Sequence, residues 1–257
     1  MKKHSINIDS ALCTGCSACV RDCPTANINI SEGRAHAIGN NCIMCGHCVA
    51  VCPAGAVSIS GFSDRPADAE PDARLDADTV LDVIRFRRAV RQFKADPIPD
   101  GVLDKIIEAG RLTHTGGNRQ DVGFVVLRDR KDEAEALACQ VFRSTKKIID
   151  PFSSLARRMT IGDHFFFFQA PAVIVVTADS AVNGALAAAS MELVAEAQGL
   201  GVLYSGFFAI AVKHSAKLQK LMGVSGRRKA VTALVLGYPA VRYLRSAPRE
   251  PARVTWL

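Results

Sequence analysis

Two stretches near the N-terminus repeat one arrangement of cysteines. The first reads Cys13-Thr-Gly-Cys16-Ser-Ala-Cys19-Val-Arg-Asp-Cys23-Pro24, and the second reads Cys42-Ile-Met-Cys45-Gly-His-Cys48-Val-Ala-Val-Cys52-Pro53. Both have the spacing C-x2-C-x2-C-x3-C-P, and every cysteine of the second run lies 29 residues after its counterpart in the first. These two runs contain all but one of the nine cysteines of the chain. The sequence therefore contains an internal duplication that is built around thiols.

Each run supplies four thiolates, which is the number that the iron corners of one [4Fe–4S] cube require. In runs of this spacing the first three cysteines bind one cube, and the fourth binds the cube of the other run. We therefore predict one ligand set of Cys13, Cys16, Cys19 and Cys52, and a second set of Cys42, Cys45, Cys48 and Cys23. Small residues between the ligands let backbone N–H groups approach the sulfur atoms.

Two other uses of dense cysteines are a zinc site and a disulfide scaffold. Zinc would use one quartet with a longer gap between its pairs of ligands. A disulfide scaffold is typical of exported chains, but no long apolar export signal follows Met1. We therefore expect a cytoplasmic protein whose residues 1–60 resemble a ferredoxin with two [4Fe–4S] clusters. The ninth cysteine, Cys139, has apolar helical surroundings, so a buried inert thiol is favoured over a reactive one.

The composition describes an ordinary globular chain. Its 257 residues are 49% hydrophobic and 22% charged, which allows one large domain or two smaller ones. The longest strongly apolar stretch, residues 200–212, is shorter than the roughly 18 residues that a membrane span needs. The net charge of +7 comes with few aromatic residues and no nucleic-acid motif, so no nucleic-acid partner is predicted.

The chain after residue 62 has a different character. Residues 63–75 are polar, contain prolines and lack apolar periodicity, which predicts a linker between a domain at 1–62 and a domain at 76–257. The second domain mixes helices and strands, so the predicted fold class is α+β. Apolar periodicity predicts helices at 78–87, 100–111, 183–198 and 213–222 and strands at 123–127, 172–177 and 231–236, besides strands at 6–8 and 57–59 in the first domain. The helix at 183–198 is apolar around most of its circumference, which is typical of a buried or interface helix.

Three polar features stand out in the second domain. Residues 85–91 hold four arginines, whose fork suits a phosphate, although a solvated basic helix end is the alternative. Residues 113–120 form a glycine-centred loop that could pair with a heteroaromatic ring edge or be a plain turn. The C-terminal tail holds four more arginines.

In their order along the chain these features resemble the FMN-dependent nitroreductase family over about residues 78–250. The resemblance implies that FMN is bound by Arg87, Arg88, Ala89, Arg91, Asn118, Gln120, Asn183, Ser205, Gly206, Arg245 and Arg249. The sequence departs from the family pattern at Ala89, where the family has serine, and at Asp121-Val122, where it has Pro-Trp. The resemblance to the family also implies a homodimer with FMN sites between the subunits. No catalytic side chain is predicted, because a flavin itself carries the electrons.

The domain order predicts an oxidoreductase that passes electrons from two clusters to FMN and on to a small organic acceptor. The resemblance implies a nitroaromatic, quinone-like or activated-alkene acceptor, with reduced ferredoxin or NAD(P)H as the donor. Three alternatives stay open: an electron-transfer module for a partner oxidoreductase, a reverse flow in which FMN oxidises a substrate, and purely structural clusters. The phenylalanine run at 165–168 is expected in a core or an interface rather than in a substrate site.

Overall fold

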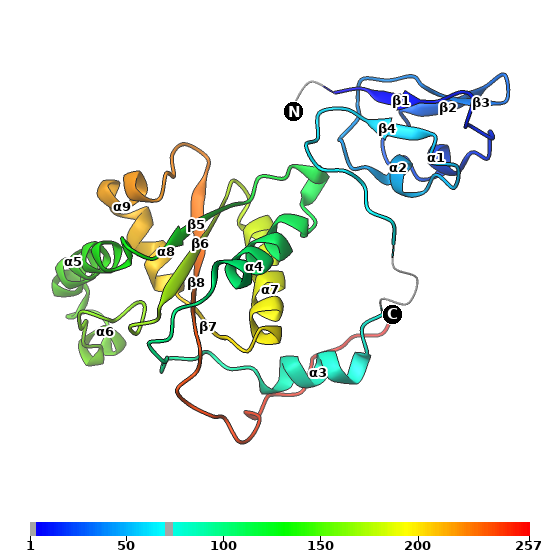
Figure 1. The fold of residues 1–257 in the computed structure, drawn as a ribbon. Helices are drawn as coiled ribbons and strands as arrows, with labels where there is room; N and C mark the ends of the chain where they lie inside the picture. Colours follow the sequence, from blue (N-terminus) through cyan, green and yellow to red (C-terminus); the bar gives the residue numbers. More distant parts are fainter. Residues whose placement is uncertain (1–3, 70–73) are drawn as a thin grey trace. The chain divides into compact units, whose positions relative to one another are not determined.

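The structure, a computed structural model, divides into two compact units (Figure 1). It describes residues 4–69 and 74–257, apart from the side chains of residues 147, 149, 155 and 156. The N-terminal unit runs to Arg74 and also includes Thr115–Arg119, and the C-terminal unit comprises Leu75–His114 and Gln120–Leu257. The described part of the predicted linker, 63–69 and 74–75, contains no helix or strand, and residues 70–73 lie outside the described residues. The predicted domain limits, 1–62 and 76–257, remain predictions.

The N-terminal unit is built from two short strand pairs and two one-turn helices. Strand β1 (Ile6–Ile8) pairs antiparallel with β4 (Val57–Ile59), and β2 (Ile28–Ser31) pairs antiparallel with β3 (Arg34–Ala37). The helices are α1 (Ala18–Arg21) and α2 (His47–Ala50). The two strands predicted at 6–8 and 57–59 are confirmed.

The duplication in the sequence extends to the backbone. Helices α1 and α2 begin after Ser17 and Gly46, which both have left-handed φ, 63° and 75°. Gly15 and Met44 are also equivalent and left-handed, with φ of 69° and 55°. Gly15 has a second constraint, because a Cβ on it would lie 2.2 Å from the carbonyl oxygen of Gly33. The two cysteine loops thus turn in the same way.

The C-terminal unit is centred on a four-stranded antiparallel sheet in the order β5-β6-β8-β7. The strands are β5 (Gly123–Leu127), β6 (Ala172–Ala178), β8 (Lys229–Gly237) and β7 (Gly201–Tyr204). The strands predicted at 123–127, 172–177 and 231–236 are confirmed, the last two with longer ends. Together with its helices, the sheet gives the predicted α+β class.

Its helices correspond to the prediction in part. Helices α3 (Ala77–Phe86), α4 (Asp100–Leu112) and α7 (Ala181–Ala197) lie within two residues of the predicted spans, and the loop at 113–120 contains a short 3-10 turn, η1 (Gly116–Asn118). Helices α5 (Lys131–Ile149) and α6 (Ser154–Arg158) were not predicted. Among the described residues no helix is both long and apolar enough to cross a membrane.

The helix predicted at 213–222 is confirmed only over Ala216–Leu221. Lys213 ends helix α8 (Gly206–Lys213), and a separate helix, α9 (Ala216–Leu221), follows. The chain leaves helical geometry at Ser215, whose hydroxyl caps α9 by accepting a hydrogen bond of 3.3 Å from the backbone N–H of Leu218. Serine is a favoured N-cap because it satisfies an amide that lacks a partner inside the helix.

The sheet separates two hydrophobic cores, one on each face (Figure 1). Strand β6 is buried along its whole length. Its side chains alternate between the faces: Val173 and Val175 join a core with α5, α8 and α9, whereas Ile174 and Val176 join a core with α4 and α7. This double-sided burial explains why the strand reads as a continuous apolar run.

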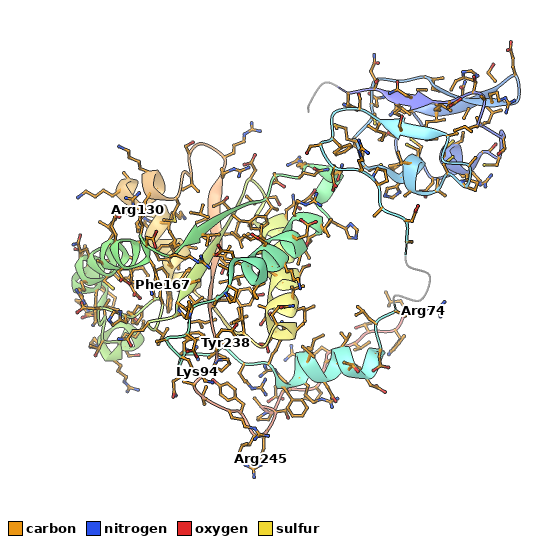
Figure 2. The ribbon with its side chains drawn as sticks, in the orientation of Figure 1. Arg74, Lys94, Arg130, Phe167, Tyr238 and Arg245 are labelled. Atoms are coloured by element: carbon orange, nitrogen blue, oxygen red, sulfur yellow. The ribbon has the colours of Figure 1, made fainter. Side chains whose placement is uncertain are left out.

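The phenylalanine run belongs to the core, as predicted. Phe166 and Phe167 are 1% and 0% exposed, and Figure 2 labels Phe167 inside the C-terminal unit. The buried carboxylate of Glu135 on α5 accepts hydrogen bonds from their backbone N–H groups, at 2.9 Å from Phe166 and 2.6 Å from Phe167. Burial raises the pKa of Glu135. The nearby Cys139 is 1% exposed, and burial raises its thiol pKa, so it is the buried thiol that the sequence predicted.

Candidate functional site

The cysteine side chains of the N-terminal unit gather in two quartets, and none of them is paired in a disulfide among the described residues. Burial raises the pKa of Cys19, and the nearby charges of Cys13, Cys52 and Cys16 raise it further. Burial raises the pKa of Cys48 to about 11, and its charged neighbours are Cys45, Cys42 and Cys23. Each quartet therefore contains three cysteines of one run and the fourth cysteine of the other run. The structure places the predicted ligand sets together.

Backbone N–H groups point at the sulfur atoms of both quartets. In the first quartet Ala35 donates to Cys13 Sγ at 3.4 Å and Ala56 donates to Cys52 Sγ at 3.3 Å. In the second quartet Met44 donates to Cys42 Sγ at 3.4 Å and Asn27 donates to Cys23 Sγ at 3.3 Å. Such bonds stabilise negative charge on thiolate sulfur and tune the potential of an iron–sulfur cluster. They accordingly lower the pKa of Cys13, mainly through Ala35 and Gly15.

The thiols of the first quartet surround a small pocket. A small pocket is lined by all four cysteines of the first quartet together with Gly15, Ala18 and Ala35. Within the described residues no three His, Cys, Asp or Glu side chains are grouped as ligands of a single metal ion. A cube does not require such a group, because each of its four irons takes its own thiolate. The donor set fits [4Fe–4S] chemistry.

Asn118 lies among the residues of the N-terminal unit. Its side-chain amide donates to the carbonyl oxygens of Ile43, at 3.0 Å, and Met44, at 2.7 Å, which lie between the ligands of the second run. Gln120, two residues later, belongs to the C-terminal unit and has a left-handed φ of 48°. The two flavin residues predicted in this loop are therefore divided between the units.

The arginine segment runs from the end of α3 along strand β7. Ala89 forms a parallel bridge with Val202, and the N–H of Val90 donates to the Val202 carbonyl at 3.1 Å. Arg88 donates through Nη1 to the carbonyl oxygens of Arg85 and Arg87, at 3.0 and 2.6 Å. Its Nη2 is buried without a hydrogen-bond partner in the described structure. A buried charged donor without a partner is costly, and a phosphate oxygen would satisfy it.

Arg87 has a protein partner. It forms an ion pair with Glu192 of α7, whose Oε2 also accepts a hydrogen bond of 3.0 Å from the Tyr204 hydroxyl. Glu192 is only 9% exposed. Glu192 was not among the residues predicted from the sequence, although it is one of two glutamates in the largely apolar helix α7. Tyr204 is followed by Ser205 and Gly206, the predicted flavin positions at the start of α8.

The Tyr204 phenol should stay protonated at alkaline pH. Burial raises its pKa above the ordinary value, and the charge of Glu192 adds to this effect. Because the pKa is raised in the folded state, the stabilisation is complete below the unfolded pKa of about 10 and is lost as the pH rises through the folded pKa. Tyr204 is one of three tyrosines. In a spectrophotometric titration to about pH 10.5, Tyr204→Phe should leave the phenolate absorbance step of the wild type unchanged. A step smaller by a third would contradict this prediction.

Asn183 has a buried carboxylate partner. Its Nδ2 donates to Asp121 Oδ1 at 2.6 Å, and the N–H of Ser180 donates to Asp121 Oδ2 at 2.9 Å. Burial tends to raise the pKa of Asp121, but the hydrogen bonds from Asn183 and Ser180 outweigh it, and the pKa is lowered. Asp121, where this sequence departs from the family pattern, thus anchors the start of α7.

The last two predicted flavin residues lie in the tail. Arg245 and Arg249 are exposed, in a segment after β8 that has no regular secondary structure (Figure 2). The structure therefore brings the arginine segment beside β7 and places the other predicted flavin residues on separate elements.

The fold and the two thiol quartets define a redox protein with an electron-carrier unit and an α+β unit. Residues 84–238 match the model of the nitroreductase family, and residues 5–53 match that of a 4Fe-4S dicluster domain. The chain belongs to the nitroreductase family. The predicted class, a nitroreductase-like oxidoreductase with a ferredoxin-type domain at its N-terminus, is confirmed.

Individual relatives are distant. Two archaeal proteins carry the provisional name NADH dehydrogenase/NAD(P)H nitroreductase. The one from Methanothermobacter thermautotrophicus is 21% identical over 180 residues, 66% of this chain and 82% of its own length. The one from Archaeoglobus fulgidus is 27% identical over 169 residues, which cover 62% of this chain and 84% of its own length. A nitroreductase structure with bound FMN from Desulfitobacterium hafniense has a TM-score of 0.58 at 23% identity and covers 69% of this chain and 97% of that one. This likeness shows the shared fold.

Proposed function

We propose that this protein is an iron–sulfur flavoprotein in which two [4Fe–4S] clusters pass electrons singly to FMN, and FMN passes them in pairs to a small organic acceptor. The observation that carries this proposal is the presence of both thiol quartets in one chain with a nitroreductase-family unit. Clusters exchange one electron at a time, whereas a flavin exchanges one or two. A nitroaromatic, quinone-like or activated-alkene compound would serve as the acceptor.

We assign the FMN phosphate to Arg88. Its buried Nη2 without a partner supports this choice, whereas Arg87 already pairs with Glu192. Arg87 then holds α7 against β7 and keeps positive charge beside the site. The remaining predicted positions, Ala89, Arg91, Asn118, Gln120, Asn183, Ser205, Gly206, Arg245 and Arg249, stay proposals as flavin contacts.

The second proposal for this unit is a homodimer. Helix α3 buries none of its residues although it is amphipathic, and Leu81, Ile84 and Phe86 are exposed. Helix α7 exposes Leu186 and Leu193 on the face away from the core. Apolar surfaces of this kind mark protein interfaces. A second copy of the chain would cover them.

Reduced ferredoxin or NAD(P)H is the proposed electron donor. The cytoplasm is the proposed location, because its reducing conditions keep thiols available to iron.

Two other functions make different predictions. A pure electron-transfer module would hold its clusters but reduce no small acceptor. A protein with reverse flow would reduce its clusters when FMN oxidises a substrate.

The composition of anaerobically purified protein tests the proposal. We expect about eight irons, about eight acid-labile sulfides and about one FMN per chain. Iron at this level with no flavin, even after FMN is added, would contradict the reductase and leave an electron-transfer module.

Replacing Arg88 should weaken flavin binding. A charge-assisted hydrogen bond contributes about 1.5–3 kcal/mol, so we expect Arg88→Ala to raise the FMN dissociation constant by roughly 10- to 100-fold. Fluorescence titration of protein stripped of flavin measures this constant. The control is Arg85→Ala, an exposed arginine of α3 that pairs with Asp82 and should leave the constant unchanged. Equal effects of the two substitutions would exclude a phosphate role for Arg88.

A further inference from the structure

The chain carries no acidic residue between Glu196 and Glu250. The nine lysines and arginines of this stretch therefore have no carboxylate near them in the sequence. Six of the nine lie between the end of α8 and the start of β8: Lys213, Lys217, Lys220, Arg227, Arg228 and Lys229. None of these six forms an ion pair with a described residue. Such a concentration of positive charge attracts an anionic ligand.

Three of these cations line one cavity of about 370 Å³, which is large enough for a small organic molecule. They are Lys213, Arg228 and Lys229, and within the described part of the chain no carboxylate lines the cavity with them. The remaining walls are mostly apolar and include Ile210 of α8 and Val224 before β8. A molecule with an apolar body and a negatively charged group fits this lining.

Arg228 is held in place by the protein. Its Nη2 donates a hydrogen bond of 3.1 Å to the backbone carbonyl of Asp121. A Cβ on Gly123 would overlap its Nη1, so the glycine at the start of β5 makes room for the guanidinium group. The Asp121 carboxylate itself accepts hydrogen bonds from Asn183 and Ser180. The charge of Arg228 is therefore positioned but not neutralised, which lowers the entropic cost of binding an anion.

The same cavity reaches a predicted flavin position. Gly206 and Lys213, the first and last residues of α8, both line it. At the rise of an α-helix these two residues lie about 10 Å apart, which is about the length of a benzene ring with a substituent at each end. A molecule of this length would reach from Gly206 to the charge of Lys213.

We propose that this cavity binds the acceptor and that the acceptor is an organic acid, whose carboxylate pairs with Lys213, Arg228 and Lys229 while its reducible group lies at Gly206. The proposal rests on the proposed function and narrows it, because a nitroaromatic, quinone-like or activated-alkene acceptor then carries an anionic group. For a nitro compound, a pair of electrons from the reduced flavin and a pair of protons from solvent give a nitroso group and water.

Calorimetric titration of the oxidised holoprotein tests the site without electron transfer. The probes are para-nitrobenzoate and its neutral analogue para-nitrobenzamide. We expect the wild type to bind the acid about tenfold more tightly than the amide. The double substitution Lys213→Gln and Lys229→Gln should weaken binding of the acid about fivefold, because both lysines are partly screened by solvent. The control, Lys217→Gln with Lys220→Gln, removes the same charge from exposed lysines of α9 that do not line the cavity, and it should leave the affinity for the acid unchanged.

The outcomes separate the cavity from the electron path. Equal affinities for acid and amide in the wild type, or equal losses in the two double variants, would overturn the proposal. Loss of FMN from the first double variant would also overturn it, because the lysines would then serve the cofactor. Consumption of the acid is measured separately, after the clusters are reduced. An acid that binds with the expected charge dependence but is never reduced would contradict the proposed function, while the binding result would still decide the anion preference of the cavity.

Discussion

Replacing Cys23 with serine is expected to release iron from the second ligand set, although Cys23 lies in the first run of the sequence. The thiol neighbours of Cys48 include Cys23, whereas those of Cys19 include Cys52. Removing one thiolate leaves one iron corner without its ligand, and the exposed cluster is lost. Iron should fall from about eight to about four per chain. Alkylation followed by mass spectrometry should then find Cys42, Cys45 and Cys48 modified.

Two further variants make this result specific. Cys52→Ser should expose the opposite trio, Cys13, Cys16 and Cys19. Cys139→Ser should leave the iron content unchanged, because Cys139 is buried in the other unit. Alkylation of Cys13, Cys16 and Cys19 in the Cys23→Ser protein would show that each run binds its own cluster and that the crossed assignment is wrong.

The second large effect is on folding. Glu135→Ala should lower the free energy of unfolding of the C-terminal unit by about 3 kcal/mol, because it leaves the backbone N–H groups of Phe166 and Phe167 buried without an acceptor. The loss should appear as a lower urea midpoint in far-UV circular dichroism of the full chain.

Two neighbouring substitutions control for the general effects of changing a glutamate on α5. Glu135→Gln keeps an oxygen acceptor and should cost less than Glu135→Ala. Glu133→Ala removes only an exposed pair with Arg130, which contributes at most about 1 kcal/mol. A midpoint for Glu135→Ala that equals that of Glu133→Ala would show that the buried carboxylate does not hold the turn before β6.

The sequence predicted those parts of the protein that repeat or alternate. The cysteine spacing gave both ligand sets as candidates, and apolar patterns located β5, β6 and β8. Helix α5 was missed because its mean hydropathy is low and its apolar stripe is interrupted by charged residues. The break between α8 and α9 depends on one capping serine, which lies in a polar segment that contains neither glycine nor proline to mark the end of a helix.

The polar contacts were less predictable, because each joins residues far apart in the chain. Arg87 and Glu192 are 105 residues apart, and Asn183 and Asp121 are 62 apart. The family resemblance suggested flavin roles for Arg87, Asn118 and Asn183, and the structure shows that each of them also has a partner within the protein. Only the folded chain shows that Arg88 keeps a buried donor without a partner.

The central claim, that the clusters supply electrons to the flavin, is tested most directly by a single-turnover reduction. Anaerobic wild-type and Cys23→Ser proteins are mixed with reduced ferredoxin, and the absorbance of the clusters and of the flavin is followed in time. We predict that in the wild type the clusters are reduced first and the flavin follows, and that in Cys23→Ser the flavin stays oxidised. Flavin reduction at the same rate in both proteins, or a flavin that stays oxidised beside fully reduced wild-type clusters, would contradict the claim.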